Sequence, residues 1–333
     1  MSLLRRHAGE IATILVVAAS LLIPRFTDDP LPISLANQIL IAITAAFSVY
    51  LMLRMNLLTF AVPAFMAIGG YAAAIAGLQG GVTDAIALTA LSFVAPAIVA
   101  LPIGVLVLRL RGVYFVLVTF VLSEIVQLVL FETPQLTGGS NGLVGMPSTT
   151  AFGIELADNA SVLVLTAAVA LAAALVTALV TSLCRQHFAA IEENEPLAQS
   201  LGLVVWHYKV LGFVVAAGLA GMAGFSLVNM LLTAHPTSFG PGSSVNYIAY
   251  TIVGGRTSIL GPVLGSALLV TLTNLFSNQG QYSQGLYGLL IVVVVLVARG
   301  GIVGTAMALV RRVGGLRPAT AHLATGTAAP RGT

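Results

Sequence analysis

The residues best suited to pass a signal to another protein lie in a short charged stretch, residues 185–209, between two long apolar segments. Asn194 is a residue type that caps helix N-termini, and Pro196 would then fall in the first turn, where its missing N–H group is not needed. Gly202 stands where a helix end favours positive φ. We therefore expect two short helices that meet near Asn194 and form an elbow at the membrane surface.

The second half of this elbow carries a small apolar group among acidic side chains. Leu197 and Leu201 are four residues apart and share one helix face, with Ala198 beside them. Such a knob would suit docking to a soluble partner. The alternative is a solvated loop whose leucines rest on the membrane surface. The acidic residues that frame the knob are Glu192, Glu193 and Glu195.

Glu124 is the only acidic residue deep within an apolar segment. With Thr119, Ser123 and Gln127 it falls within an arc of about 140° on a helix of 3.6 residues per turn. An ionisable group at membrane depth costs about 3 kcal/mol or more, so it should face the interior of a bundle or water and have a partner. Glu124 therefore either lines a translocation pathway or, when protonated, ties helices together.

A glycine-rich run follows the segment that contains Glu124. No lysine or arginine accompanies this run, which argues against a nucleotide-binding loop. We expect a tight external turn that shapes a pore mouth or a docking surface for a binding protein. The run consists of Thr137, Gly138, Gly139, Ser140, Asn141 and Gly142.

Glycine and proline also interrupt two apolar segments. Pro63 precedes Gly69 and Gly70 in one segment, and the Gly254-Gly255 pair precedes Pro262 in the other. Broken helices in transporters line cavities where freed backbone groups can meet a ligand. The sequence predicts such breaks here, and a simple packing kink is the alternative.

Several other chemistries are excluded by composition. The single cysteine, Cys184, rules out an intrachain disulfide and a cysteine-based metal cluster. The five histidines show no metal-ligand spacing, and no nucleophile–base set is evident. The 14 basic residues are too few and too dispersed for nucleic acid. We expect no metal, no cofactor bound by this chain, no enzymatic activity and no nucleic-acid partner.

Apolar segments must position these residues. Of 333 residues, 58% are hydrophobic and only 8% are charged, whereas soluble domains carry about 25% charged residues. A helix crosses the ~30 Å hydrocarbon core with about 20 apolar residues, and the runs are continuous rather than alternating as in membrane strands. The sequence predicts an all-α fold, a polytopic transmembrane helical bundle with about ten membrane segments and broken helices. The expected spans are 11–24, 34–53, 57–78, 85–108, 113–131, 161–183, 208–232, 244–255, 258–276 and 285–298.

Basic residues predict the orientation of this bundle. With the N-terminus inside, every basic residue except Arg25 falls on the cytoplasmic side, as the positive-inside rule requires. The segment 244–255 is too short for an ordinary crossing. Without it, however, Arg311, Arg312 and Arg317 would lie outside, so we expect a short, buried, broken crossing there, with eight or nine crossings as the alternative.

The two ends of the chain differ from its middle. Arg5 and Arg6 before apolar residues 11–23 also resemble a secretory signal peptide. No clear cleavage site follows, so we expect a retained first helix. Residues 317–333 are of low complexity and are expected to form a disordered cytoplasmic tail. The rest, residues 1–316, is expected to be a single transmembrane domain.

Six segments together resemble one transporter family. The stretch AAIEENEPLAQSLGL, followed by Tyr208-Lys209, resembles the coupling loop of ABC importer permeases, and more narrowly that of the M-type permease subunit of branched-chain amino acid importers. Glu192 departs from the family, which usually has an arginine there, and residues 57–71 lack a histidine that the family tends to carry. The other matching segments are LRGVYFVLVT at 110–119, Glu-Ile at 124–125, LTGGSNGL at 136–143, GG-x-x-S-x-x-GPVLG at 254–265 and Arg-Gly at 299–300.

The resemblance implies a permease subunit that does not hydrolyse ATP itself. It implies a protein of the bacterial inner membrane, with both termini cytoplasmic and membrane lipid around it. Its partners would be a homologous second permease, two cytoplasmic ATPase subunits that bind the ATP, and an external solute-binding protein. The substrate would be leucine, isoleucine or valine, with urea, short amides or other small acids as the alternative. A stand-alone secondary transporter is less favoured, because it would need more intramembrane carboxylates than Glu124.

The residues and the resemblance together give expected roles. Contact with the ATPase is expected of Ala190, Ile191, Glu192, Glu195, Leu197, Ala198, Leu201 and Gly202. The translocation pathway is expected to include Glu124, Gln127, Tyr114, Gly69, Gly70, Gly254 and Gly255. The external mouth, near residues 133–160 and 233–246, would receive solute from the binding protein.

Overall fold

A computed structural model describes residues 2–21, 29–151 and 153–276, together with positions 285, 288, 301, 302 and 304. This part of the chain is mostly α-helical. The helices are α1 (Ser2–Ala19), α2 (Pro30–Leu53), α3 (Val62–Leu78), α4 (Ala85–Val107), α5 (Val113–Glu132), α6 (Pro134–Thr137), α7 (Asn159–Leu183), α8 (Arg185–Ser200), α9 (Val205–Leu231), α10 (Ser243–Gly254) and α11 (Leu260–Phe276). The shorter elements are the 3-10 helices η2 (Gly139–Asn141) and η3 (Pro236–Phe239) and the strands β1 (Leu143–Val144), β2 (Thr149–Ala151), β3 (Ile154–Leu156) and β4 (Thr233–Ala234).

Five of these helices are long and apolar enough to cross a membrane, namely α2, α4, α5, α7 and α9. Residues 9–19 of α1, together with α3 and α11, are shorter apolar helices. The helical membrane class predicted from composition is therefore confirmed. Apart from positions 285 and 288, the last predicted span, 285–298, lies outside the described residues, as does the tail 317–333, so the count of about ten segments stays a prediction.

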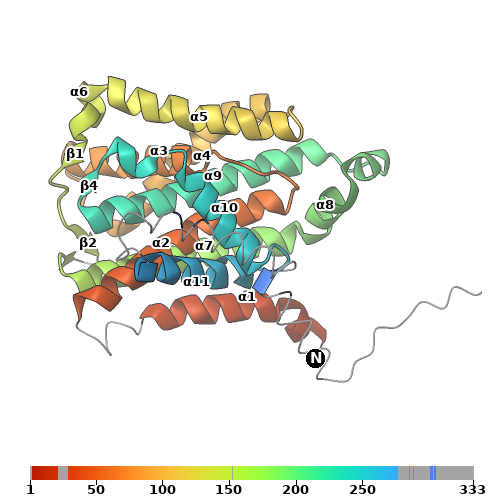
Figure 1. Ribbon diagram of the computed structural model, residues 1–333, viewed down its shortest axis with the longest axis horizontal. Helices are drawn as coiled ribbons and strands as arrows, with labels where there is room; N and C mark the ends of the chain where they lie inside the picture. Colours follow the sequence, from red (N-terminus) through yellow and green to blue (C-terminus); the bar gives the residue numbers. More distant parts are fainter. Residues whose placement is uncertain are drawn as a thin grey trace, which may run out of the picture.

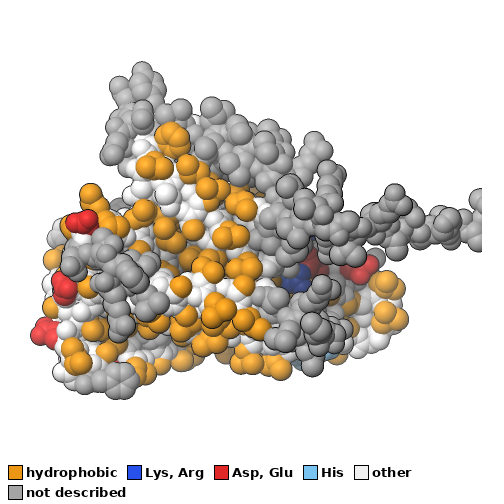
Figure 2. Space-filling view, turned by 90° about the horizontal axis from the view of Figure 1, so that it is seen from below, with side chains coloured by type: hydrophobic (Ala, Val, Ile, Leu, Met, Phe, Trp, Pro, Cys, Tyr) orange, Lys and Arg blue, Asp and Glu red, His pale blue; other side chains and the backbone are white. Residues whose placement is uncertain are grey.

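The bundle has two distinct ends (Figure 1). The elbow helix α8 and the beginning of α1 lie at one end, on the right of the view, whereas α6 and the short strands lie at the other. Helix α5 runs along one side of the bundle and α1 along the opposite side. On the face seen in Figure 2, hydrophobic side chains cover the middle and charged side chains gather at the two ends, as expected for a body that sits in a bilayer.

Helix α9 is the centre of the bundle and packs against α2, α3, α4 and α7. Its glycines allow the neighbouring backbones to come close: a Cβ atom at Gly224 would collide with the carbonyl oxygen of Met66 in α3. A Cβ atom at Gly69 in α3 would collide in turn with the backbone of Gly221. Small residues at such contacts are typical of membrane helices, which associate through close packing.

This packing corrects one of the predicted helix breaks. Helix α3 is continuous through Gly69 and Gly70, both of which are buried, so these glycines serve helix–helix contact and not a break. The interruption lies earlier, because residues 57–61 are not helical and α3 begins only at Val62. The predicted continuous span from residue 57 is therefore wrong at its beginning.

The second predicted break is confirmed. Helix α10 ends at Gly254, and Gly255 has a φ of 116°, which disfavours any residue with a side chain. At 1.5 Å per residue, 12 residues of α10 extend about 18 Å, well short of the hydrocarbon core. α10 nevertheless connects the two ends of the bundle. Before it comes η3, which contacts α3 and α5 at the end that carries the short strands, and after it comes Arg256, which lies near Glu192 of α8 at the other end.

Candidate functional site

The elbow expected around Asn194 is present. Asn194 has non-helical angles (φ −159°, ψ 98°), so α8 consists of two helices joined by a kink. The Asn194 Oδ1 atom accepts a hydrogen bond from the N–H of Leu197 at 3.1 Å, as an N-cap does. The second half ends at Gly202, which has a φ of 89°, and the N–H of Leu203 donates to the carbonyl of Ala198.

The inner face of the elbow packs against the helical bundle itself. Ile191 and Ala198 are buried and form a small apolar cluster with Val205 at the start of α9. Ala190 and Tyr208 border this cluster, and the rings of Tyr208 and His187 stack with centroids 4.3 Å apart. Ala198 and Ile191, expected to contact a soluble partner, are thus turned away from the surface, because the kink brings both halves of α8 onto α9.

The outer face of the elbow is open. The side chains of Leu197 and Leu201 are exposed to 56% and 80%, and Glu193, Pro196 and Gly202 are also exposed. We call these five residues the outer elbow surface. Of the predicted apolar knob, Leu197 and Leu201 are exposed on this surface but Ala198 is not. The apolar area that another protein could cover is therefore smaller than expected.

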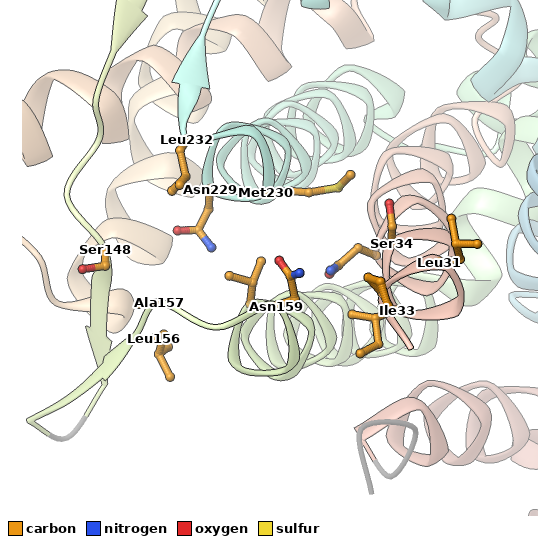
Figure 3. Close-up of a pocket in the computed structure, with 13 residues that line it drawn as sticks. Leu31, Ile33, Ser34, Ser148, Leu156, Ala157, Asn159, Asn229, Met230 and Leu232 are labelled. Carbon is orange, nitrogen blue, oxygen red and sulfur yellow. The ribbon is translucent and has the colours of Figure 1, made fainter. Parts of the chain in front are cut away.

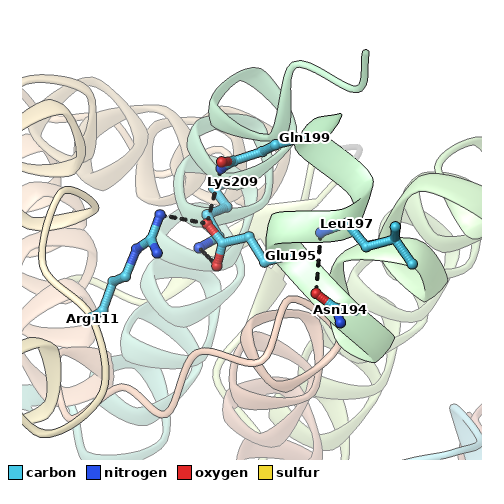
Figure 4. Close-up of polar contacts among 6 residues, drawn as sticks. All are labelled: Arg111, Asn194, Glu195, Leu197, Gln199 and Lys209. Atoms are coloured by element: carbon cyan, nitrogen blue, oxygen red, sulfur yellow. Dashed lines mark hydrogen bonds and ion pairs between the residues drawn. The ribbon is translucent and has the colours of Figure 1, made fainter. Parts of the chain in front are cut away.

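Four cations converge on two carboxylates of the elbow. Glu195 Oε2 lies 2.8 Å from Lys209 Nζ of α9, and Glu195 Oε1 lies 3.8 Å from Arg111 Nη2 in the α4–α5 loop (Figure 4). Glu192 Oε2 lies 2.9 Å from Nη1 of Arg54 at the end of α2. Its Oε1 lies 3.9 Å from Nε of Arg256, between α10 and α11.

These ion pairs tie the elbow to four separate segments of the bundle. Most of them are partly exposed and individually weak, but Lys209 is only 4% exposed, so its pair with Glu195 compensates a nearly buried charge. Any displacement of α8 must therefore move these segments or break their pairs. Glu192 and Glu195 face the bundle, whereas they were expected to face a partner.

The sequence reasoning missed the cationic half of this network. It used Arg54, Arg111 and Arg256 only as markers of orientation. A signal was present, because each of these arginines directly follows an apolar segment on the side to which the elbow was assigned. Their specific pairing with two glutamates depends on tertiary structure, which sequence spacing does not give.

The non-helical segment 57–61 is held by hydrogen bonds inside the bundle. The N–H of Phe60 donates to Thr119 Oγ1 of α5 at 3.1 Å. Its carbonyl accepts hydrogen bonds from Ser123 Oγ of α5 at 2.7 Å and from Ser244 Oγ of α10 at 2.8 Å. Irregular backbone at membrane depth requires such partners. Thr119 and Ser123 thus hold the entry of α3, a role that the sequence reasoning did not assign to them.

Glu124 lies on the other side of α5. Its side chain is exposed, as is that of Tyr114, and α5 is the least buried of the five long spans. The carboxylate was expected to face the interior of the bundle or water. Within this chain it faces outward and not the interior, because Ser123 one residue earlier takes the inward direction. Gln127 lies between the two directions and donates from Nε2 to the carbonyl of Pro236 at 3.2 Å.

The glycine-rich run 137–142 forms the tight turn that was expected. Gly138, Gly139 and Gly142 all have positive φ, and Thr137 Oγ1 donates to the carbonyl of Leu130 at 2.6 Å. The adjoining strand β1 pairs with β4. His235 Nε2 lies 2.9 Å from the carbonyl oxygen of Ser140, so it is this nitrogen that carries the proton and donates. The turn is therefore fastened to the loop after α9, a link that the sequence reasoning missed.

The remaining candidate residues are explained by packing. Gly254 lies against α11, where a Cβ atom would collide with the carbonyl of Gly261, and Gly69 and Gly70 lie against α9. Among the described residues, no group of three or more His, Cys, Asp or Glu side chains is arranged to hold a metal ion.

Comparisons with known proteins agree with this architecture. The family model for the permease component of branched-chain amino acid transport systems matches residues 31–298. The chain is 28% identical, over 218 aligned residues, to the high-affinity branched-chain amino acid transport system permease protein LivM of Escherichia coli (strain K12), and equally to LivM of Salmonella typhimurium (strain LT2). Each alignment covers 58% of this chain and 51% of the relative, so the chain spans about half the length of the curated relatives it matches. No solved structure matches.

Proposed function

Because the chain belongs to the family of permease components of branched-chain amino acid transport systems, we propose that it is the transmembrane permease subunit of an ATP-driven ABC importer. The observation that carries the proposal is the elbow α8, whose two glutamates bind cations from four bundle segments while its outer surface stays open. That arrangement suits a part that receives force on one face and passes it to the helices behind the other.

The proposed partners fit separate surfaces of the chain. One of two cytoplasmic ATPase subunits docks on the outer elbow surface through Leu197 and Leu201, and ATP is bound by those subunits alone. A homologous second permease covers the outward face of α5. The solute-binding protein docks at the opposite end, over the turn 137–142 and the loop that β4 and η3 form.

The translocation pathway of this proposal runs along α5. An unpartnered carboxylate facing lipid is unfavourable by about 3 kcal/mol or more, so Glu124 and Tyr114 are placed between the two permeases and not toward the bilayer. Arg111, two residues before α5, lies 3.8 Å from Glu195 and is one link between α8 and this face. The N-terminus and the elbow are assigned to the cytoplasmic side of the inner membrane.

Leucine, isoleucine and valine are the proposed substrates, and three cavities whose described lining residues include no charged side chain are consistent with them. The test is uptake of radiolabelled leucine by proteoliposomes that contain this chain, its second permease, the ATPases and the binding protein. We expect uptake that needs ATP and every subunit. Uptake of urea or a short amide instead would redirect the substrate, and full uptake by this chain alone would refute the ABC mechanism.

A further inference from the structure

A cavity of about 410 Å³ lies at the end of the bundle opposite to the elbow. It is bounded by the first turns of α2 and α7, the last turn of α9 and the segment next to β2 and β3 (Figure 3). Its size is within the range of small-molecule sites. It is distant from the α5 face, because α2 and α7 lie on the side of the bundle that carries α1.

Two buried amides in this cavity have unused hydrogen-bonding atoms. Asn37 of α2 and Asn229 of α9 both line it, and each is only 3% exposed. Asn37 Oδ1 and Asn229 Nδ2 have no hydrogen-bond partner among the described residues. Buried polar atoms are nearly always paired in folded proteins. An unpaired acceptor and an unpaired donor on two residues that line one cavity therefore favour a ligand that supplies both after a small rotation of each amide.

The orientation of Asn229 is fixed by a neighbour. Thr149 Oγ1 lies 3.3 Å from Asn229 Oδ1, and the hydroxyl donates to that oxygen. The amide nitrogen is thereby directed away from Thr149, and in Figure 3 it points into the space toward Asn159, the first residue of α7. A donor is thus held in place for an acceptor group of the ligand.

The start of α7 faces the same space and favours a negative group. The Asp158 side chain makes no capping hydrogen bond with the first-turn N–H groups, and the N-terminus of a helix carries a partial positive charge. Asn229 Nδ2 and the first turn of α7 therefore suit a carboxylate. Asn37 Oδ1, on the α2 wall, suits an ammonium group. No Lys, Arg, Asp or Glu is among the described residues that line the cavity, which favours a ligand without net charge.

The remaining walls are aliphatic and come from Ile33, Leu156, Val162, Met230 and Leu232. We propose that this cavity is a binding site for one zwitterionic amino acid with an aliphatic side chain. Its carboxylate lies between Asn229 and the start of α7, and its ammonium group lies at Asn37. The inference rests on the proposed substrate class and adds a site within a single permease, on the side where the binding protein is proposed to dock.

The test uses the purified complex of both permeases and the ATPases, without the binding protein. Binding of radiolabelled leucine is measured for Asn37→Leu and Asn229→Leu, which keep the side-chain size and remove one hydrogen-bonding group each. Gln79→Leu is the matched control, because this exposed residue after α3 undergoes the same amide-to-leucine change outside the cavity. We expect affinity to fall tenfold or more in both asparagine variants and to stay unchanged in the control.

A second measurement does not depend on variants that disturb the amides. Ser34 lines the cavity, and a Ser34→Cys variant in a Cys184→Ala background can be labelled with a water-soluble thiol reagent. Saturating leucine should slow its labelling at least fivefold, whereas glutamate should not, and Gln79→Cys should show no protection. Slowing by phospholipid but not by leucine would overturn the proposal in favour of a lipid site.

Transport by the same preparations, with the binding protein restored, separates the two levels of inference. One outcome is that the complex imports leucine while the asparagine variants bind it with unchanged affinity and leucine does not slow labelling of Ser34→Cys. In that case the cavity proposal is wrong and the proposed function stands. If the complex imports no amino acid, the proposed substrate class is wrong, and the cavity proposal that rests on it is wrong too.

Discussion

Replacing Glu195 by glutamine isolates the strongest link between the elbow and the bundle. The Lys209 side chain is 5% exposed and its ammonium group lies 2.8 Å from the Glu195 carboxylate. Removing one partner of a fully buried pair costs about 3–5 kcal/mol. Glu195 is 23% exposed and its contact with Arg111 is a surface pair of little value, so we expect about 2–3 kcal/mol.

Hydrogen exchange over residues 185–209 measures this loss locally. If the elbow opens as a unit, 2–3 kcal/mol corresponds to exchange that is about 30- to 150-fold faster. ATPase stimulation by the loaded binding protein should fall in parallel. Glu193→Gln is the matched control for hydrogen exchange only, since Glu193 is exposed and has no ion pair in the described part of the chain but belongs to the outer elbow surface.

Lys209→Met gives the reasoning its sharpest test. Methionine removes the buried charge, keeps an unbranched apolar chain and leaves the Glu195 carboxylate near Arg111. It should therefore destabilise the elbow less than Glu195→Gln does, and adding it to Glu195→Gln should restore much of the protection. Equal exchange in Glu195→Gln and Glu193→Gln, or a double variant worse than Glu195→Gln alone, would refute the buried-charge argument.

Three further changes probe other parts of the molecule. Leu201→Arg on the outer elbow surface should lower coupled ATPase activity at least tenfold with elbow exchange unchanged, whereas Ala198→Arg should unfold the elbow itself; exchange and ATPase assays on both variants decide this. Gly224→Val should prevent stable folding, because its side chain meets the Met66 carbonyl at a cost of about 3 kcal/mol, and the yield of monodisperse protein measures the effect. Glu124→Gln should assemble normally and reduce leucine flux if the carboxylate lines the path; unchanged flux at both pH 6 and pH 8 would remove it from the path.

The caps of the elbow were predictable from sequence because their chemistry is local. An asparagine before Glu-Pro and a glycine after Ser-Leu specify a helix start and a helix end through their own backbone preferences. Which face of the elbow turns inward was not predictable. Ala198 and Leu197 are neighbours of similar apolar character, and only the position of Val205 on α9 decides that Ala198 is buried.

Within the membrane, hydropathy gave the correct class and the approximate position of most helices but not their breaks. Residues 57–61 are as apolar as a membrane helix, so this non-helical segment was predicted to be part of a span. What permits it is a set of hydroxyls on α5 and α10 that lie far away in sequence. At Gly69 and Gly70 a break was predicted where the helix is continuous. Glycine is typical of helix breaks and also of close helix packing, and here it allows contact with Gly221 and Gly224.

The direction of Glu124 shows a different limit. A helical wheel groups it with Thr119 and Ser123, but 100° separates neighbouring residues, enough to place Ser123 against Phe60 and Glu124 on the outer surface. Helical periodicity alone therefore cannot say which of two neighbouring residues faces the interior. The partner helices decide which side of the arc is interior.

The carbonyl oxygen of Phe60 accepts hydroxyl hydrogens from two different helices at once. A carbonyl has two lone pairs, so either serine can withdraw while the other keeps the oxygen satisfied. When α5 slides past α10, the Phe60 carbonyl would therefore keep one hydrogen bond and not be left bare in hydrocarbon. This junction therefore holds α5, α10 and the entry of α3 together, and it would allow one serine to move away at a low cost in free energy.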